Sequence, residues 1–170
     1  MHDKWLRWVA LTTTILAVIT AIFSMKASGF STKVQILTTK ENNQWGYFQS
    51  KSIKQHSLEL QKDLFILEKS RDGNNSQFTE YLSKKTDEYQ KDLDRYNKEK
   101  AEIKKSAEDT IKEEEKFKNK GASLGLGVMF LQISIMLSSV GALIKKQELW
   151  IIGLCFGLIG VFYGVIGLIK

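Results

Sequence analysis

Three uncharged, predominantly apolar segments interrupt an otherwise polar chain of 170 residues. They cover residues 8–25, 121–144 and 149–169, and they are 18, 24 and 21 residues long. A helix that crosses a hydrocarbon core about 30 Å thick needs roughly 20 apolar residues. The pattern therefore predicts three transmembrane helices, at residues 8–25, 122–144 and 149–169. A polar leader at residues 1–7 precedes the first helix, and a tight basic loop at residues 145–148 joins the last two.

The polar region between the first two apolar segments, residues 26–121, divides into halves of equal length. Residues 71–76 read RDGNNS, and Asp, Gly and Asn tolerate the left-handed conformation that a helix reversal needs. The flanking halves, 26–71 and 76–121, each have 46 residues, and the chain contains no proline. The predicted fold class is an all-α membrane protein with a long antiparallel, coiled-coil-like helical hairpin between its first and second transmembrane helices. Gly29 and the β-branched residues after it lower helix propensity, which leaves open a break near Gly29.

Apolar residues recur at heptad spacing in both arms of the predicted hairpin. In the outgoing arm, Ile53, Leu60 and Leu67 are spaced by seven, and Leu64 completes the a/d pattern. The returning arm has one column of six residues and, beside it, a more polar column of five. The first is Leu82, Tyr89, Tyr96, Ile103, Thr110 and Phe117, and the second is Thr86, Leu93, Lys100, Ala107 and Glu114. One strong and one weak column predict a shallow antiparallel seam between the arms.

A short signature follows the Ala/Thr-rich first segment, where residues 43–56 read NQWGYFQSKSIKQH. It fits the pattern W-x-Y-x-Q-x-K-x-x-K through Trp45, Tyr47, Gln49, Lys51 and Lys54. A basic pair followed by a tryptophan separates the last two apolar segments, at Lys145, Lys146 and Trp150. On these residues, and over nearly its whole length, the chain resembles the bacterial domain-of-unknown-function family 4337. The resemblance implies a three-helix inner-membrane protein, and it implies no activity, because none is established for the family.

The same stretch forms a candidate interaction patch. Its members are Trp45, Tyr47, Phe48, Gln49, Lys51 and Lys54. On a helix, Trp45, Phe48 and Gln49 share one face, and Tyr47 lies with the two lysines on the adjacent face. The patch could dock a partner through an aromatic anchor, or it could be the core between the arms with lysine stems laid over it. The sequence leaves both interpretations open.

Small residues at helical spacing mark the faces on which the apolar segments are expected to pack, because they let helix backbones approach closely in lipid. The face of the first segment is Ala10, Thr13, Ala17, Thr20, Ser24 and Ala27. The third segment carries a continuous helix-packing seam, which is Gly153, Gly157, Gly160, Gly164 and Gly167.

These faces, together with apolar residues that one partner arm should not cover, predict a closed homo-oligomer in which the glycine seam is buried. The uncovered residues are expected to be Trp45, Phe48, Phe65, Phe78 and Tyr81. The alternative is that the glycine seam packs only against the second apolar segment of the same chain.

The charge pattern and the missing catalytic motifs argue against several classes of function. The net charge is +6, but residues 26–121 carry 20 basic and 17 acidic residues with interspersed signs, which is typical of solvated helix faces and not of a nucleic-acid groove. The lone Cys155 cannot form an intramolecular disulfide, and His2 and His56 lack neighbours at metal-ligand spacing. Phosphate loops and nucleophile motifs are missing from the sequence. We therefore expect neither an enzyme nor catalytic, cofactor-binding or metal-binding residues.

The predicted function is that of a membrane-anchored structural or interaction protein, which self-associates and projects the hairpin as a spacer or docking surface. The alternative is an oligomeric pore lined by Thr13, Thr20, Gln132 and serines. Expected partners are membrane lipid, further copies of the chain, and another membrane or envelope protein. The positive-inside rule, applied to Lys4, Arg7 and the basic loop, predicts a multi-pass protein of the bacterial inner membrane with a cytoplasmic N-terminus and a periplasmic hairpin.

Overall fold

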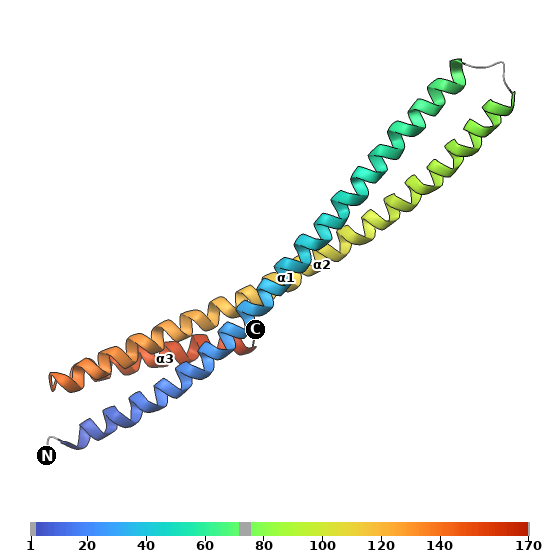
Figure 1. Cartoon of the computed structure of the whole chain (residues 1–170). Coiled ribbons are helices and arrows are strands. Elements are labelled where there is room, and N and C mark those ends of the chain that lie inside the picture. The colour runs from blue at the N-terminus through green and yellow to red at the C-terminus, as the bar shows by residue number, and fades with distance from the viewer. Residues whose placement is uncertain (1–2, 72–75, 170) are drawn as a thin grey trace. The chain divides into compact units, whose positions relative to one another are not determined.

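The computed structural model describes residues 3–71 and 76–169, and every element in these ranges is an α-helix. Helix α1 covers Asp3–Arg71, α2 covers Ser76–Leu143, and α3 covers Gln147–Ile169 (Figure 1). The predicted all-α fold with three helices is confirmed. Helix α1 runs through Gly29, where a break had been left open. The predicted turn at residues 71–76 falls mainly on residues 72–75, which lie outside the described residues.

The chain forms two compact units. The three-helix unit comprises Met1–Leu37 and Glu113–Lys170, and the two-helix unit comprises Thr38–Lys112. The three-helix unit therefore contains the beginning of α1, the end of α2 and all of α3, whereas the two-helix unit contains the remaining parts of α1 and α2.

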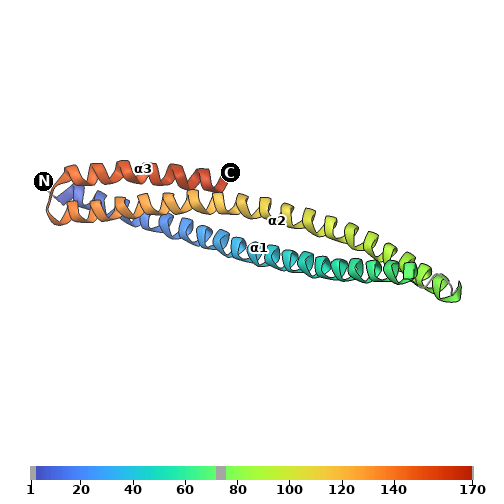
Figure 2. The ribbon, with the colours of Figure 1, turned by 90° about the horizontal axis from the view of Figure 1, so that it is seen from above.

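In the three-helix unit, α3 lies along the C-terminal part of α2 (Figure 2). The inward column of α1 is spaced by seven and is half-buried or buried throughout: Val9, Leu16, Phe23, Phe30 and Leu37. The inward face of α2 follows a 3, 4, 3, 4, 3 spacing and is fully buried: Leu124, Gly127, Leu131, Ser134, Ser138 and Gly141. Phe23, Leu124 and Leu131 form the centre of the core. The two faces differ in kind, because α1 supplies large side chains and α2 alternates large and small ones.

A tight reversal joins α2 to α3. Lys145 has a φ of 56°, the Lys146 N–H donates to the Gly141 carbonyl at 3.0 Å, and the Lys145 N–H donates to the Ala142 carbonyl at 3.4 Å. This pair of hydrogen bonds is the Schellman motif, in which the residue with positive φ is usually glycine. Lys145 adopts the left-handed backbone conformation although it has a side chain. The crowding of its Cβ therefore adds local strain that a glycine would not have.

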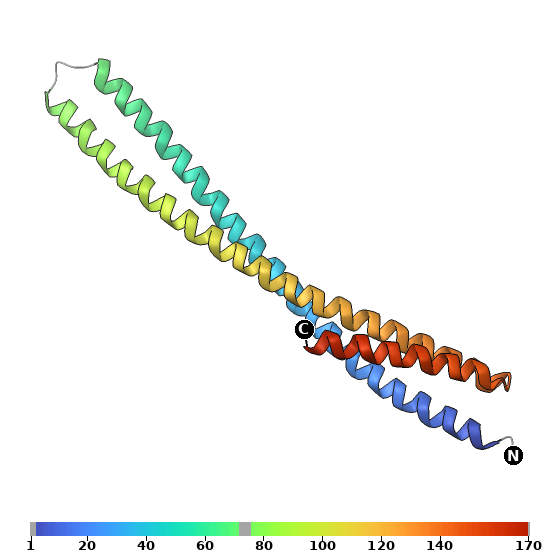
Figure 3. The same ribbon diagram turned by 180° about the vertical axis from the view of Figure 1, so that it is seen from behind.

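In the two-helix unit, α1 and α2 lie side by side as the two arms of a hairpin (Figure 3). The predicted seam of the returning arm is confirmed for this unit. Leu82 and Thr110 are buried, and Tyr89, Tyr96 and Ile103 between them are half-buried. The companion column also faces inward, since Leu93 and Ala107 are buried and Thr86 and Lys100 are half-buried. Phe117, the last residue of the first column, belongs to the three-helix unit, where its ring packs 5.8 Å from that of Phe30.

The predicted seam of the outgoing arm is wrong. Ile53, Leu60, Leu64 and Leu67 have exposed fractions of 70, 53, 62 and 61%. The helix instead turns inward a face that comprises Trp45, Phe48, Lys51, Gln55, Leu58, Lys62 and Phe65. This face makes aromatic and cation–π contacts with the returning arm. Phe65 stacks on Tyr89, Lys51 lies over the Tyr96 ring, and Lys100 lies over the Phe48 ring. The four exposed residues, hereafter the leucine stripe, are left facing outward.

Candidate interaction surfaces

The candidate interaction patch is divided by the hairpin. Trp45, Phe48 and Lys51 are half-buried between the arms, whereas Tyr47, Gln49 and Lys54 are exposed on the outer surface. The rings of Trp45 and Phe48 meet edge to face, with their centroids 5.6 Å apart. Trp45 Nε1 also donates to Glu41 Oε1 at 3.1 Å. The sequence had left both a docking patch and an inter-arm core open, and the aromatic half of the patch lies between the arms.

Lys51 is the polar centre of this part of the hairpin. Its Nζ lies 2.6 Å from Glu99 Oε2 on the returning arm and 5.1 Å from the centre of the Tyr96 ring. The hydrogen bond from Lys51 stabilises the ionised carboxylate, so the pKa of Glu99 is lowered from its ordinary value. One lysine of the signature therefore pairs the two arms within one chain.

Further polar and aromatic contacts extend the seam in both directions. Lys100 Nζ donates to Gln55 Oε1 at 3.0 Å and lies 5.0 Å from the centre of the Phe48 ring. The rings of Phe65 and Tyr89 stack with centroids 5.5 Å apart. Phe65 and Phe78 are half-buried, so the expectation that Trp45, Phe48, Phe65 and Phe78 stay uncovered is wrong, and only Tyr81 is exposed. The aromatic residues that seemed to need a second copy are used inside the hairpin.

The glycine seam of α3 lies against its own chain. A Cβ placed on Gly153 or Gly157 would lie 2.8 Å from Ser138 Oγ or 2.9 Å from Ser134 Oγ, respectively. On Gly160 it would lie 2.9 Å from the backbone nitrogen of Leu131.

The same is true at the far end of the seam. A Cβ on Gly164 would overlap the Phe23 ring, and one on Gly167 would lie 2.9 Å from the backbone nitrogen of Leu124. The seam is occupied by α2 and by Leu16 and Phe23 of α1, which corresponds to the intramolecular alternative. Contact of this seam with a second copy is therefore excluded in this conformation.

The small-residue face of α1 is only partly covered. Thr13, Thr20 and Ala27 are half-buried, and Ala10, Ala17 and Ser24 are exposed. The hydroxyls of Thr13 and Thr20 donate to carbonyls of their own helix at 2.6–3.0 Å. On α2, Gln132 is exposed near the middle of the apolar segment.

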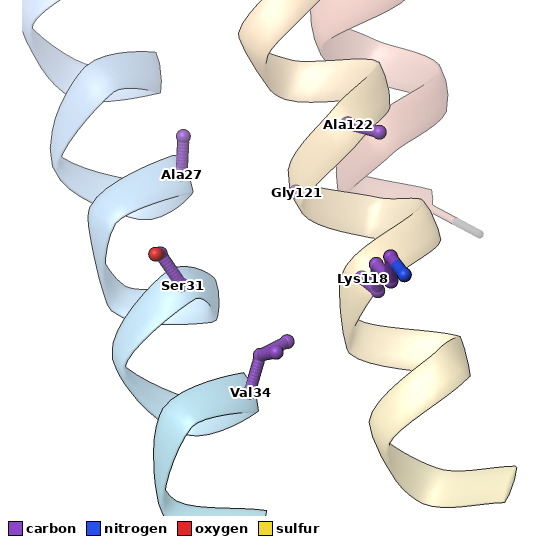
Figure 4. Close-up of a pocket in the computed structure, with 6 residues that line it drawn as sticks. All are labelled: Ala27, Ser31, Val34, Lys118, Gly121 and Ala122. Atoms are coloured by element: carbon purple, nitrogen blue, oxygen red, sulfur yellow. The ribbon is translucent and has the colours of Figure 1, made fainter. Parts of the chain in front are cut away.

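A pocket of 280 Å³ opens between α1 and α2 within the three-helix unit (Figure 4). It is lined by Ala27, Ser31, Val34, Lys118, Gly121 and Ala122. In Figure 4 three of these residues, Ala27, Ser31 and Val34, lie on α1, and the other three lie on α2. Lys118 is the one charged residue among the six. The pocket therefore has a mostly apolar lining and a single cationic side chain, that of Lys118. Among the described residues, no group of three His, Cys, Asp or Glu side chains could hold a metal ion.

The N-terminal part of α1 meets the start of α3. The centroids of the Trp5 and Trp150 rings are 6.5 Å apart, and Trp150 Nε1 donates to Thr12 Oγ1 at 3.2 Å. Since Lys4 and Arg7 flank Trp5 in sequence, and Lys145 and Lys146 closely precede Trp150, these four cations lie at the same end of the three-helix unit.

The family model described as "Domain of unknown function (DUF4337)" matches residues 5–170. The chain belongs to this family. No match was found among curated proteins or among solved structures. In this DUF4337 member, the residues on which the resemblance rests fall into both units. Lys51 contacts the returning arm, Lys54 is exposed, and Trp150 contacts the beginning of α1.

Proposed function

We propose that this DUF4337 protein is a membrane-anchored structural or interaction protein. In this proposal the three-helix unit spans the membrane, and the two-helix unit presents a docking surface. The observation that carries it is an exposed heptad stripe of large aliphatic residues on a hairpin whose own seam is already filled. Large exposed apolar patches on soluble surfaces are commonly sites of interaction.

The packing of the three-helix unit supports the membrane part of the proposal. All three helices are long and apolar enough to cross a membrane. Residues buried between α2 and α3 are largely glycine and serine, whereas large apolar residues such as Leu158, Phe162 and Met136 are 65–73% exposed. In water this distribution would leave a costly apolar surface, but in lipid that surface is solvated and small residues let the helices pack closely.

The orientation follows from the cations at one end of the three-helix unit. Lys4, Arg7, Lys145 and Lys146 lie in short segments, where the positive-inside rule applies most strongly. Lys145 also keeps its charge at a position where glycine would relieve strain. We propose a cytoplasmic N-terminus and α2–α3 loop in the bacterial inner membrane, with the hairpin in the periplasm. The lysines close to the other membrane boundary, such as Lys26 and Lys118, oppose this orientation and weaken it.

Self-association is proposed on the basis of two outward-facing features. The first is the leucine stripe of the two-helix unit. The second is Gln132, whose amide would face lipid near the middle of α2 and could hydrogen-bond to a second copy, because an amide both donates and accepts. The partners proposed are therefore lipid, further copies of the chain, and another membrane or envelope protein. No enzymatic activity and no nucleic-acid binding are proposed.

A pore is less well supported. Ser134 and Ser138 are buried against Gly157 and Gly153, and the Thr13 and Thr20 hydroxyls are used by their own helix. These are most of the polar groups that an aqueous path would need. Ser24, Gln132 and Ser139 are exposed, but the Ser139 hydroxyl donates to its own helix. Gln132 suits a helix–helix contact as well as a pore lining.

The proposal is tested on the full chain in native membranes and in mild detergent. Resistance to carbonate extraction, together with a detergent-corrected mass above 19.4 kDa for the polypeptide, is expected. A protein released by carbonate would contradict membrane anchoring, and a monomer in several mild detergents would contradict self-association.

The orientation is tested by cysteine labelling in intact cells. A single cysteine is placed at Glu108 in a Cys155→Ala background and is exposed to an impermeant reagent. Glu108 is exposed on the returning arm, and protection of this site until the cells are permeabilised would reverse the orientation.

A further inference from the structure

We infer that the leucine stripe pairs the outgoing arms of two copies in antiparallel orientation. This inference deepens the proposed function, on whose self-association it rests. The surface consists of Ile53, Leu60, Leu64 and Leu67, none of which the returning arm covers.

The spacing of the stripe is that of one side of a coiled coil. Ile53, Leu60 and Leu67 occupy d positions, and Leu64 occupies an a position. Ser57, the preceding a position, is also exposed, so the whole face is available from residue 53 to residue 67. A seam of this kind needs a helix of matching length, and a second copy of the same arm provides one.

In an antiparallel coiled coil, an a residue of one helix packs beside a d residue of the other. Placing Leu64 of one copy beside Leu60 of the second produces two equivalent leucine layers around the two-fold axis. The same register places Ser57 beside Leu67 of the second copy in the two flanking layers. Two layers that pair a large with a small residue therefore flank the two leucine layers, which allows close packing. Beyond them, the register places Ile53 beside Arg71 of the second copy.

The charged residues beside the stripe favour this direction. Lys54 and Glu68 both occupy e positions and both are exposed. In the antiparallel register, e positions face e positions, so Lys54 of each copy meets Glu68 of the other, and this attractive pair occurs twice. The one like-charge contact is between the two copies of Asp63, a g position at the axis.

A parallel pair would have the opposite electrostatics. There a g residue meets the e residue of the next heptad on the partner, so Asp63 would face Glu68 twice. Arg71, at the next a position, would also face its own copy in the core. The parallel pair therefore has three repulsive contacts, whereas the antiparallel pair has two attractive contacts and one repulsive contact. This difference favours the antiparallel arrangement.

Disulfide trapping of the full-length protein tests the pairing. In a Cys155→Ala background, Ser57→Cys protein is mixed with differently tagged Leu67→Cys protein and mildly oxidised. The antiparallel register brings these two positions into one layer, whereas two copies of residue 57 lie about 15 Å apart along the axis. Disulfide formation requires Cα atoms within about 7 Å. We expect the mixed 57–67 product and little 57–57 product.

Charge reversal sharpens the test. Lys54→Glu and Glu68→Lys should each slow formation of the mixed product about tenfold, because each variant turns two attractive contacts into two repulsive ones. The double variant should restore it. Lys69→Glu is the matched control, since this exposed residue lies at an f position away from the contact and should change little.

Several outcomes would overturn the inference. Dominant 57–57 trapping, or faster trapping with Glu68→Lys, would indicate a parallel pair. If neither product forms although the wild-type protein is oligomeric, the stripe binds lipid or another protein, and the proposed self-association survives through a different surface. A double variant no better than the single variants would remove the Lys54–Glu68 contact from the interface.

Discussion

The two units of this protein bury opposite kinds of side chain. In the three-helix unit the glycines of α3 lie against serines and backbone atoms of α2 and against the Phe23 ring of α1, and large apolar residues of α3 face outward. In the two-helix unit the contacts between the arms are aromatic rings and ion pairs, such as Phe65 on Tyr89 and Lys51 with Glu99. The same two helices, α1 and α2, take part in both.

The difference is the one that the proposed surroundings favour, lipid for the three-helix unit and water for the two-helix unit. In lipid, burying a large side chain gains little, so close backbone contact between small residues provides the packing energy. In water, burial of aromatic surface contributes about 25 cal/mol per Å², and lysine stems can cover the rings while their charged ends stay solvated. Each unit therefore responds to a different kind of mutation.

The largest effect is expected from truncating the core of the two-helix unit. Leu82 is 2% exposed, and Leu82→Ala should lower the free energy of unfolding by about 3 kcal/mol through lost burial and a residual cavity. Leu64→Ala is the matched control, because Leu64 is 62% exposed and its loss should cost under about 1 kcal/mol in the monomer. Urea unfolding of the full chain in detergent, followed by helicity at a dilution at which the chain is monomeric, measures both. Equal losses would mean that the outgoing arm has turned its leucine stripe inward.

The next largest effect is expected from adding a single methyl group to the glycine seam. A Cβ on Gly160 would meet backbone atoms of Leu131 and Gly127, which cannot move aside as a flexible side chain can. Gly160→Ala should therefore cost about 1–3 kcal/mol. Gly125→Ala is the control, since its Cβ would meet nothing within 4 Å and alanine favours the helix. Titration with a denaturing detergent separates the two, and identical curves would show that α3 does not pack closely on α2.

Much of the fold could be predicted from the sequence because its strongest signals are local. Uncharged segments of sufficient length define the apolar helices, and glycine at 4, 3, 4, 3 spacing defines a packing face whatever its partner is. The inward face of the returning arm was equally predictable, since Leu82 and Thr110 belong to an unbroken column at heptad spacing. What the glycine spacing could not decide is whether α2 or a second copy fills the seam, because both present the same kind of surface.

The outgoing arm could not be predicted because it carries two candidate stripes. The leucine stripe has the better heptad of aliphatic residues, whereas the stripe that is buried interrupts its aromatic residues with Lys51 and Gln55. Only the positions of Tyr96, Glu99 and Lys100 on the returning arm make the second stripe the better partner. That information is non-local, and propensity and spacing within one helix do not contain it. The signal that could have identified the buried stripe is the set of charged residues that the returning arm places opposite it.

A smaller effect, of opposite sign, is expected at the loop of the three-helix unit. Lys145 has a φ of 56°, and Lys145→Gly should stabilise this unit by about 1 kcal/mol by removing the crowding of its Cβ. Lys146→Gly is the control, because Lys146 is not among the residues with positive φ and should gain nothing. Denaturing-detergent titration measures the gain. A loss of stability in Lys145→Gly would indicate that the lysine side chain makes a contact that outweighs the strain.

The smallest effect is expected from pH, and it should separate the two units. The pKa of Glu99 is lowered in the folded hairpin by the hydrogen bond from Lys51. A lowered folded-state pKa means that the unfolded state binds protons more readily, so the pair stabilises the hairpin above the ordinary glutamate pKa. That contribution is lost as the pH falls through the lower, folded-state value.

The urea midpoint of the two-helix unit should therefore decrease on acidification, and Glu99→Gln should make this decrease shallower. Glu102→Gln, on the exposed side of α2, is the matched control. The stability of the three-helix unit, whose interior contacts involve glycine, serine and apolar residues, should change less over the same range. An acid slope that Glu99→Gln leaves unaltered would show that Lys51 and Glu99 do not pair in solution.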